Sequence, residues 1–405
     1  MKFHKFLPFA LAAMLTSASA ETLQLTGNQR WLALASDKDK DVAIGIARHE
    51  SGRSSVVKVV SSKSGYYGVI AGPYSAKTIQ DLKRRDKDSL FADLPQDALM
   101  SRGDNYIATI WQAPKGNGIG LSAFALDKAA QLSSGPLQAT VSAQRLGNEN
   151  AYTSVDGKDG RGTFHFDIGK DLPKDELARA EEFTGLNYNN AGVAQLVPGT
   201  DAPQVIVTNF SGGAHCCTST YLLSRDQAQG GWSMTKSPTL DGEGYWFEDV
   251  DGDGALELMS SDNAFFYAFD SYAGSAAPIK ISKLRGGKIE DVTDDPAMHA
   301  RLVQDMAGLD YDAKIRPEYK KSNGFLAAWV ASKIRLGQGD MAWATFMKSY
   351  DKQSTFGPQD CVTGQKIEDC PADNLKPIPI PKALAQFLRG NGYGPLPKAA
   401  EVELK

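Results

Sequence analysis

The sequence predicts an α+β protein with an N-terminal βαββαβ domain, a central antiparallel β domain and a C-terminal helical cap stapled by a disulfide. Strand-like and helix-like segments alternate near the start of the chain. Short apolar segments separated by turn residues fill the middle, and a helical period begins at residue 297. The expected parts are a leader (1–20), the N-terminal domain (21–112), a β-rich connecting module (113–186), the central β domain (187–300) and the helical domain (301–405).

The composition is that of a folded protein. Hydrophobic residues make up 42% and charged residues 23% of the 405 residues, and the formal net charge is -4. No apolar run reaches the roughly 18 residues needed to span a bilayer. The slightly negative net charge does not indicate a basic surface of the kind that binds nucleic acid. We therefore expect neither membrane insertion nor a nucleic-acid partner, while protein partners cannot be read from the composition.

The first twenty residues have the pattern of a secretory signal peptide. The start is basic at Lys2 and Lys5, residues 6–15 are apolar, and small residues end the segment at Ala20. Cleavage near Ala20 predicts a periplasmic or secreted protein.

The four cysteines are expected to be bonded in such an oxidising compartment. Cys361 and Cys370 enclose a short polar loop, and a link between them would contribute on the order of 3 kcal/mol. We predict that pair. The adjacent Cys216 and Cys217 leave three alternatives open: a vicinal disulfide, one half of a cross-link, or a soft-metal site with His215.

The N-terminal segment carries alternating element types. The expected strands and helices are 31–35 (strand), a helix opened by acidic residues 37, 39 and 41, 56–60 (strand), 66–71 (strand), 75–85 (helix) and 106–111 (strand). Acidic residues suit a helix N-terminus, and Ser75 can cap the second helix. The order is that of a split βαβ sandwich.

Within this segment, Gly65-Tyr66-Tyr67-Gly68-Val69-Ile70-Ala71-Gly72-Pro73-Tyr74-Ser75 resembles the central strand and turn of the SPOR family. The resemblance implies binding of peptidoglycan glycan strands, preferentially those stripped of stem peptides, on the face of the sheet. The candidate glycan-binding residues are Trp31, Tyr66 and Tyr67. Because side chains alternate along a strand, one of the two tyrosines could stack on a sugar while the other packs in the core.

The middle of the chain favours a β-meander or sandwich. Residues 113–186 fit either a small β-rich module or an extended linker and carry no visible site. The expected later strands are 193–197, 204–209, 218–224, 244–247, 255–259, 263–269 and 278–284.

An acidic turn gives the strongest chemical signal. Asp249, Asp251, Asp253 and Glu257 occupy relative positions 1, 3, 5 and 9, and the carbonyl of Ala255 falls at position 7. Ca²⁺ takes 6–8 oxygen ligands and tolerates irregular geometry. Four acidic groups this close repel one another unless they are neutralised. We expect a structural Ca²⁺ ion, with a solvated turn that holds no ion as the alternative.

The flanks of this turn exclude an EF-hand, because both read as strands and position 12 is not a glutamate. The segment 249–258 resembles instead the calcium turn of FG-GAP or VCBS-type β repeats.

A second cluster, Asn209-Phe210-Ser211-Gly212-Gly213-Ala214-His215-Cys216-Cys217-Thr218, combines glycines, a histidine and two thiols. It resembles a GGAHCC turn of uncharacterised secreted bacterial proteins, which implies no activity. A structural disulfide turn, a metal or redox role and catalysis are the alternatives, with His215 as a weak catalytic candidate.

We found no nucleophile elbow, zincin motif or phosphate-binding loop. The chain is therefore expected to be a periplasmic cell-envelope binding protein that contacts peptidoglycan. The alternative is a cell-wall hydrolase that uses the β domain near His215.

Overall fold

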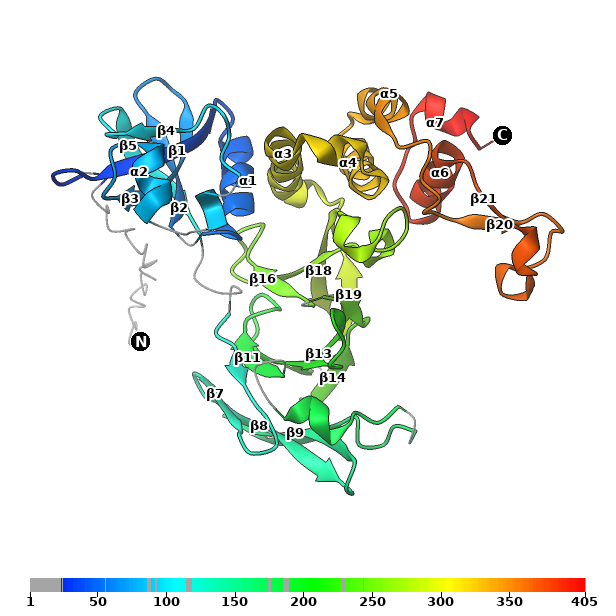
Figure 1. Ribbon diagram of the computed structural model, residues 1–405. Coiled ribbons are helices and arrows are strands. Elements are labelled where there is room, and N and C mark those ends of the chain that lie inside the picture. The colour runs from blue at the N-terminus through cyan, green and yellow to red at the C-terminus, as the bar shows by residue number, and fades with distance from the viewer. Residues whose placement is uncertain are drawn as a thin grey trace, which may run out of the picture.

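Stacked β sheets form an elongated part of the molecule that we call the stem (Figure 1). At one end the stem meets an N-terminal module and a helical module, which we call the two heads. The computed structural model describes residues 23, 25–54, 56–85, 89–91, 93–113, 119–173, 176–184, 189–226, 230–242 and 244–404. The predicted leader, residues 1–20, lies outside the described residues.

The N-terminal module is a five-stranded antiparallel sheet with two helices packed on one face. Its elements are β1 (Arg30–Asp37), α1 (Lys40–Ser51), β2 (Val57–Ser62), β3 (Tyr67–Tyr74), α2 (Ile79–Arg85), β4 (Leu99–Ser101) and β5 (Tyr106–Gln112). Side chains alternate along β1, so Leu32 and Leu34 pack under the helices while Trp31 packs on the opposite face. The carboxylate of Asp39 accepts the backbone N–H of Asp41 at 2.8 Å and caps α1.

The strand order β4-β1-β3-β2-β5 corrects the predicted fold class. The segment 106–111, expected to close the βαββαβ unit, forms β5 beside β2, and the unpredicted β4 lies beside β1. The element order is therefore βαββαββ, so an N-terminal SPOR-like βαββαβ domain is wrong. A strand of three residues is too short to show an alternating pattern, which explains why β4 was missed.

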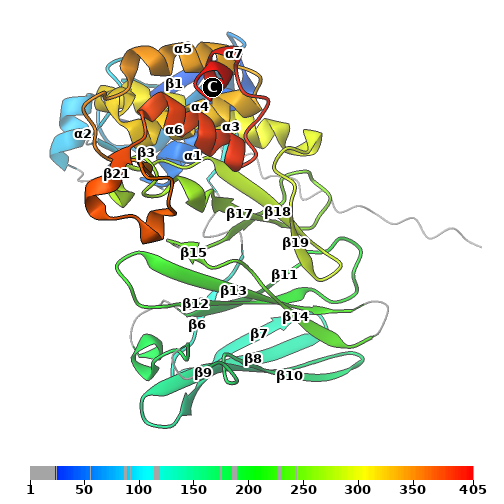
Figure 2. The same cartoon turned by 90° about the vertical axis from the view of Figure 1, so that its right-hand side faces the viewer.

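Two further sheets form a sandwich in the stem (Figure 2). The outer sheet has the order β10-β9-β8-β7, and the inner one runs β14-β13-β12-β11-β6, with β15 paired to β13. Apolar side chains from both inner faces, such as Val141 and Val155 against Val205 and Leu223, share one core. The bounds are β6 (Ser122–Ala123), β7 (Ala130–Ser134), β8 (Leu137–Leu146), β9 (Asn150–Asp159), β10 (Gly162–Ile168), β11 (Asn190–Ala194), β12 (Gln204–Phe210), β13 (Cys216–Arg225), β14 (Trp232–Lys236) and β15 (Leu240–Asp241).

A fourth sheet joins the sandwich to the heads. It consists of β16 (Trp246–Glu248), β17 (Glu257–Ser261), β18 (Ile279–Arg285) and β19 (Lys288–Asp291) in sequential order. The predicted strand 263–269 is instead a 3-10 turn, Asn263–Phe265, followed by a loop. With a two-stranded hairpin, β20 (Gln359–Cys361) and β21 (Leu375–Pro377), the described residues hold five sheets. The α+β class is therefore wrong, because the chain is mostly β sheet.

The helical module begins with α3, which packs against α1 of the N-terminal module. Its elements are α3 (His299–Ile315), α4 (Asn323–Arg335), α5 (Gly339–Ser349), α6 (Ile380–Gly390) and α7 (Lys398–Val402). A Cβ at Gly45 of α1 would lie 2.1 Å from the carbonyl oxygen of Gln304 of α3, so the close helix contact requires glycine. Trp343, Phe346 and Leu384 are fully buried in the core of this module.

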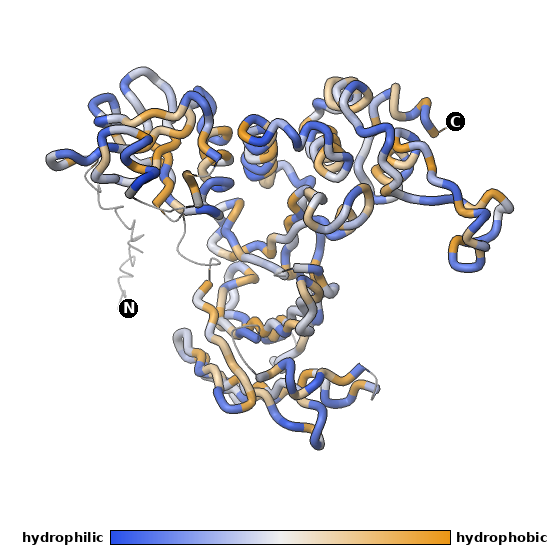
Figure 3. Tube along the Cα trace, in the orientation of Figure 1, coloured by the Kyte–Doolittle hydropathy of each residue, from blue (hydrophilic) through white to orange (hydrophobic). Residues whose placement is uncertain are grey.

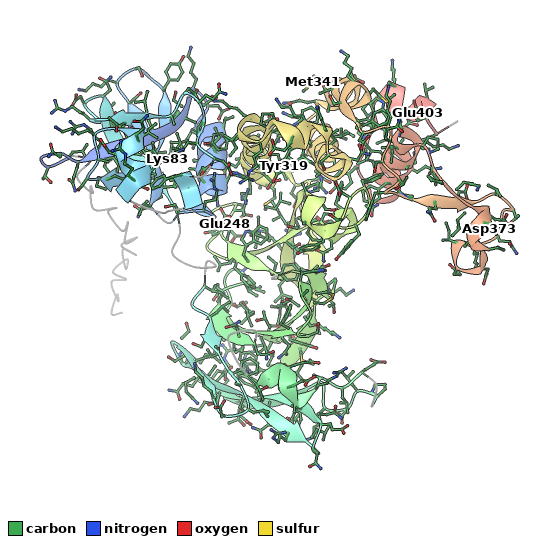
Figure 4. The ribbon with its side chains drawn as sticks, viewed as in Figure 1. Lys83, Glu248, Tyr319, Met341, Asp373 and Glu403 are labelled. Atoms are coloured by element: carbon green, nitrogen blue, oxygen red, sulfur yellow. A yellow bond between two sulfur atoms is a disulfide. The ribbon has the colours of Figure 1, made fainter. Side chains whose placement is uncertain are left out.

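Glu248, labelled in Figure 4, links the stem to both heads. Its carboxylate forms an ion pair with Arg48 of α1 and another, at 3.4 Å, with Arg301 of α3. Figure 3 shows hydrophobic and hydrophilic residues interleaved along the strands and helices, with hydrophobic residues also in the outlying arm at the right. Within the described part of the chain, every helix is too short or too polar to cross a membrane.

Candidate functional site

His215 lies directly before β13, where β15 pairs with that strand. The pairing of Cys216 with Asp241 brings the histidine and the aspartate together. The ring Nδ1 of His215 is 2.7 Å from a carboxylate oxygen of Asp241. The backbone N–H of Gly242 also donates to the carbonyl of His215 at 2.7 Å, which fixes the backbone behind the ring. The site is thus built on sheet hydrogen bonds rather than on a free loop.

Two tyrosines from the segment between β17 and β18 complete the cluster. The hydroxyl of Tyr267 is 2.7 Å from Nε2 of His215, and the ring of Tyr272 stacks on the imidazole at 4.0 Å between centroids. Tyr267 has a φ of 62°, the one positive φ of a non-glycine residue in the described chain. Strained backbone of this kind gathers at functional sites. We call His215, Asp241 and Tyr267 the histidine relay.

The partners fix the proton positions in the relay. A carboxylate accepts hydrogen bonds only, so Nδ1 of neutral His215 carries the proton that Asp241 accepts. Nε2 is then free to accept the O–H of Tyr267. This is the arrangement in which a histidine takes a proton from a hydroxyl while a third group orients it. The side chain of His215 is 32% exposed, so a ligand can reach the relay.

The structure joins Cys216 and Cys217 in a vicinal disulfide, which selects one of the three alternatives. Without free thiols, the pair offers neither a thiolate nucleophile nor a soft-metal ligand beside His215. The backbone N–H of Gly213 donates to the carbonyl of Cys216 at 3.1 Å, and a Cβ at Gly213 would lie 2.2 Å from that oxygen. The glycine therefore lets the turn close over the disulfide.

In the acidic turn between β16 and β17 the carboxylates gather around the side chain of a lysine. Nζ of Lys283, on β18, lies 2.5 Å from Asp251, 3.0 Å from Asp253 and 3.1 Å from Glu257. Single oxygens of Asp249, Asp251 and Glu257 lie within 4.8 Å of one another, a spacing that could hold a metal ion. Two of these three groups already bind Lys283. The residues as arranged therefore do not fit Ca²⁺ unless the ammonium leaves.

In this turn, hydrogen bonds and burial shift the pKa values of the charged side chains in opposite directions. The backbone N–H of Ala255 and, second, Lys283 lower the pKa of Asp253. Burial raises the pKa of Glu257, which is 1% exposed. Burial alone would lower the pKa of Lys283, but its hydrogen bonds to Asp251, Asp253 and Glu257 outweigh burial and raise the pKa. The ammonium is therefore charged throughout the physiological pH range.

The predicted glycan-binding residues do not share a surface. Trp31 is 2% exposed and packs with Val60 and Ile70. Tyr67 contributes to the core on the opposite, helical face of the sheet. Tyr66 is exposed, but it stands apart from Trp31 at the turn before β3. Trp31 is therefore not available to stack on a sugar in this arrangement.

The structure forms the disulfide between Cys361 and Cys370. It closes an arm that projects from the helical module and contains the β20–β21 hairpin (Figure 1). Cys361 pairs with Leu375 across the hairpin. The bond therefore holds a segment with little core of its own.

Sequence reasoning missed Asp241, Tyr267, Tyr272 and Lys283. The segment 265–272 is rich in aromatic residues, which could have marked it as part of a site, but the strand expected there hid this. Lys283 lies far from the turn along the chain and belongs to an ordinary strand pattern. Only the pairing of β17 with β18 brings it to the carboxylates.

Comparison with known proteins finds relatives whose names state neither an activity nor a ligand. An uncharacterised protein, y4bJ of Sinorhizobium fredii, is 35% identical over 96% of this chain and 59% of its own length. A probable thylakoid lumen protein, sll0997 of Synechocystis, is 34% identical over 47% of this chain and 56% of its own length. The chain thus spans less than two thirds of either relative.

No solved structure matches the chain significantly. Neither the SPOR resemblance nor the FG-GAP/VCBS resemblance is supported by these matches. The family model that matches is that of the sll0997 C-terminal domain, over residues 302–392. This range runs from within α3 to just beyond α6. Residues 302–392 therefore carry a domain of the sll0997 C-terminal type.

Proposed function

We propose that the protein works outside the cytoplasm, in the periplasm or after secretion, with cleavage near Ala20. The leader pattern supports export. The two disulfides suit an oxidising compartment. The name of the cyanobacterial relative, a probable thylakoid lumen protein, points to a compartment of the same kind.

We propose further that it is a cell-envelope hydrolase that uses the histidine relay. The observation that carries this proposal is the unbroken chain of two 2.7 Å contacts from Asp241 through His215 to the hydroxyl of Tyr267. General acid–base catalysis needs a base within hydrogen-bond reach of the proton that it removes. Peptidoglycan is the polymer that the proposed location offers as a substrate.

In this proposal each relay residue has one role. His215 takes the proton of Tyr267, and the tyrosine oxygen forms a bond to the sugar carbon of a glycosidic link. The bond from that carbon to the leaving oxygen breaks on the face opposite the tyrosine, the leaving oxygen takes a proton from water, and the hydroxide left behind removes the extra proton from the imidazolium. Water then hydrolyses the tyrosyl–sugar bond and restores the hydroxyl. Asp241 orients the ring and stabilises its charged form.

A binding protein without catalysis is the second candidate, with glycan contact at the relay. Aromatic rings gather there: Tyr272 lies 5.0 Å from Phe266 and 5.8 Å from Tyr267 between centroids. Tyr267 is 47% exposed. Exposed aromatic rings beside polar groups offer both apolar area and hydrogen bonds to a ligand.

Sedimentation with purified sacculi, with and without stem peptides, separates the two candidates. A hydrolase releases soluble fragments, whereas a binder only pellets with the sacculi. Tyr267→Phe and His215→Asn should abolish release. His165→Asn is the matched control, because His165 also pairs with an aspartate but has no tyrosine hydroxyl as a partner. Absence of both pelleting and release would discard both candidates.

A further inference from the structure

The acidic turn has its own cation, supplied by the neighbouring strand. Ser282 of β18 pairs with Leu258 of β17, which places Lys283 beside Glu257 at the base of the turn. The side chain of Lys283 is only 12% exposed, and it reaches three carboxylates within 3.1 Å. An ammonium with three donors is thereby fully satisfied.

Every carboxylate oxygen of the turn has a hydrogen-bond or ion-pair partner. Lys283 binds one oxygen each of Asp251, Asp253 and Glu257. Backbone N–H groups donate to the other five oxygens: Gly252 and Gly254 to Asp249, Asp253 to Asp251, Ala255 to Asp253, and Val250 to Glu257. The repulsion that predicted a divalent ion is thus offset by groups of the chain itself.

Glu257 explains why the cation must be permanent. It is 1% exposed, and a buried carboxylate without a partner is strongly destabilising. A dissociable ion would leave this carboxylate without a cation whenever the ion was absent, with the backbone N–H of Val250 donating to one of its oxygens. A covalently attached ammonium at 3.1 Å is present at every calcium concentration.

A divalent ion would have to displace the lysine. The possible ion position uses Asp249, Asp251 and Glu257, and the last two are partners of Lys283. Two cations that share these oxygens would lie within a few ångströms of each other, where like charges repel strongly.

We propose that Lys283 is the resident cation of the acidic turn, so that the turn folds without Ca²⁺, and that removing this ammonium converts the turn into a Ca²⁺ site. The acidic positions expected to ligate calcium are then partners of an internal ion pair. The resemblance of the turn to a calcium loop lies in its carboxylates and glycines, and Lys283 is the residue that changes its chemistry.

Thermal melting of the full chain in EDTA and in about 10 mM CaCl₂ tests the proposal. This calcium concentration is well above the Kd of about 10⁻⁴ to 10⁻³ M that is typical of extracellular sites. The wild type should melt at the same temperature in both. Lys283→Met removes the charge but keeps a long side chain, so it should melt lower in EDTA and gain roughly 2–5 °C in CaCl₂. Lys283→Arg, which keeps the charge, should respond as the wild type does.

Two results would overturn the proposal. One is a wild-type melting temperature that falls in EDTA and recovers with Ca²⁺, which is the outcome that a structural calcium ion requires. The other is a folded Lys283→Met variant that ignores Ca²⁺. If that variant does not fold, calorimetric titration of the wild type with Ca²⁺ decides: saturable binding refutes a resident ammonium, and no binding supports it.

Discussion

Two histidines of the stem each use both ring nitrogens, but their partners differ in kind. His165, on β10, has Nδ1 at 2.8 Å from Asp156 and Nε2 at 3.1 Å from Asp167. His215 has a carboxylate on one side and the hydroxyl of Tyr267 on the other. Because a carboxylate only accepts, His165 satisfies both partners when both of its nitrogens carry protons. An aspartate–histidine pair is therefore not enough for base catalysis. The partner of the second ring nitrogen decides whether that nitrogen can accept a proton.

The surroundings strengthen this contrast. The side chain of His165 is 55% exposed on the outer sheet of the stem, and the hydrogen bond that its ring N–H donates to Asp156 raises the pKa of the histidine. His215 is 32% exposed and covered on one side by the ring of Tyr272. The first histidine is thus arranged to hold a proton, whereas the second is arranged to receive one.

The largest expected difference between the two histidines appears when the carboxylate partner of each is changed in turn. In Asp241→Asn the amide can donate to Nδ1, which favours the tautomer with the proton on Nε2. His215 then cannot accept from Tyr267, and release of soluble fragments from sacculi should fall roughly 10²–10⁴-fold. Asp156→Asn should leave the release unchanged.

Nitrogen NMR of histidine-labelled protein checks the same substitution without an activity assay. The spectrum of Asp241→Asn should show that the proton of His215 has moved from Nδ1 to Nε2. An unchanged tautomer in a folded variant would contradict the assignment of proton positions in the relay, whatever the effect on release.

The contrast between the two histidines could not be drawn from sequence. His215 stood out because it adjoins two cysteines and two glycines, so one member of the relay was a candidate from the start. Asp241 and Tyr267 are 26 and 52 residues away along the chain. They reach the histidine through strand pairing and through a strained loop. Neither feature leaves a periodic pattern in the sequence.

The fold was likewise only partly predictable from the sequence. The segments that form β12 and β13 were readable because both faces of each strand are largely buried, so each contains a nearly continuous run of apolar and small residues. β4 was not readable, and its position changed the order of the N-terminal sheet. The acidic turn was also readable as a local motif. Its cation was not, because Lys283 reaches the turn only through the register of β17 and β18.

A smaller effect is expected from the glycine that closes the turn before His215. Gly213→Ala places a methyl group where the carbonyl of Cys216 lies, so the turn must open. We expect a loss of about 1–3 kcal/mol in the free energy of unfolding, measured by denaturant titration. Gly231→Ala, where a Cβ meets nothing within 4 Å, is the control and should change stability by less than about 0.5 kcal/mol. Equal losses in both variants would show that close packing at the turn is not the cause.

The smallest expected effect is a pH dependence at His165. Its folded pKa is raised above the unfolded value of about 6.5, so the protonated ring stabilises the fold fully below that pH. This stabilisation is lost as the pH rises through the folded pKa. The pair is exposed, so the contribution should stay below about 1 kcal/mol. The difference in free energy of unfolding between the wild type and His165→Asn should therefore be largest below about pH 6.5 and shrink as the pH rises above that value. A difference that stays constant over this range would mean that the two aspartates do not hold a proton on His165, and the contrast with His215 would rest on exposure alone.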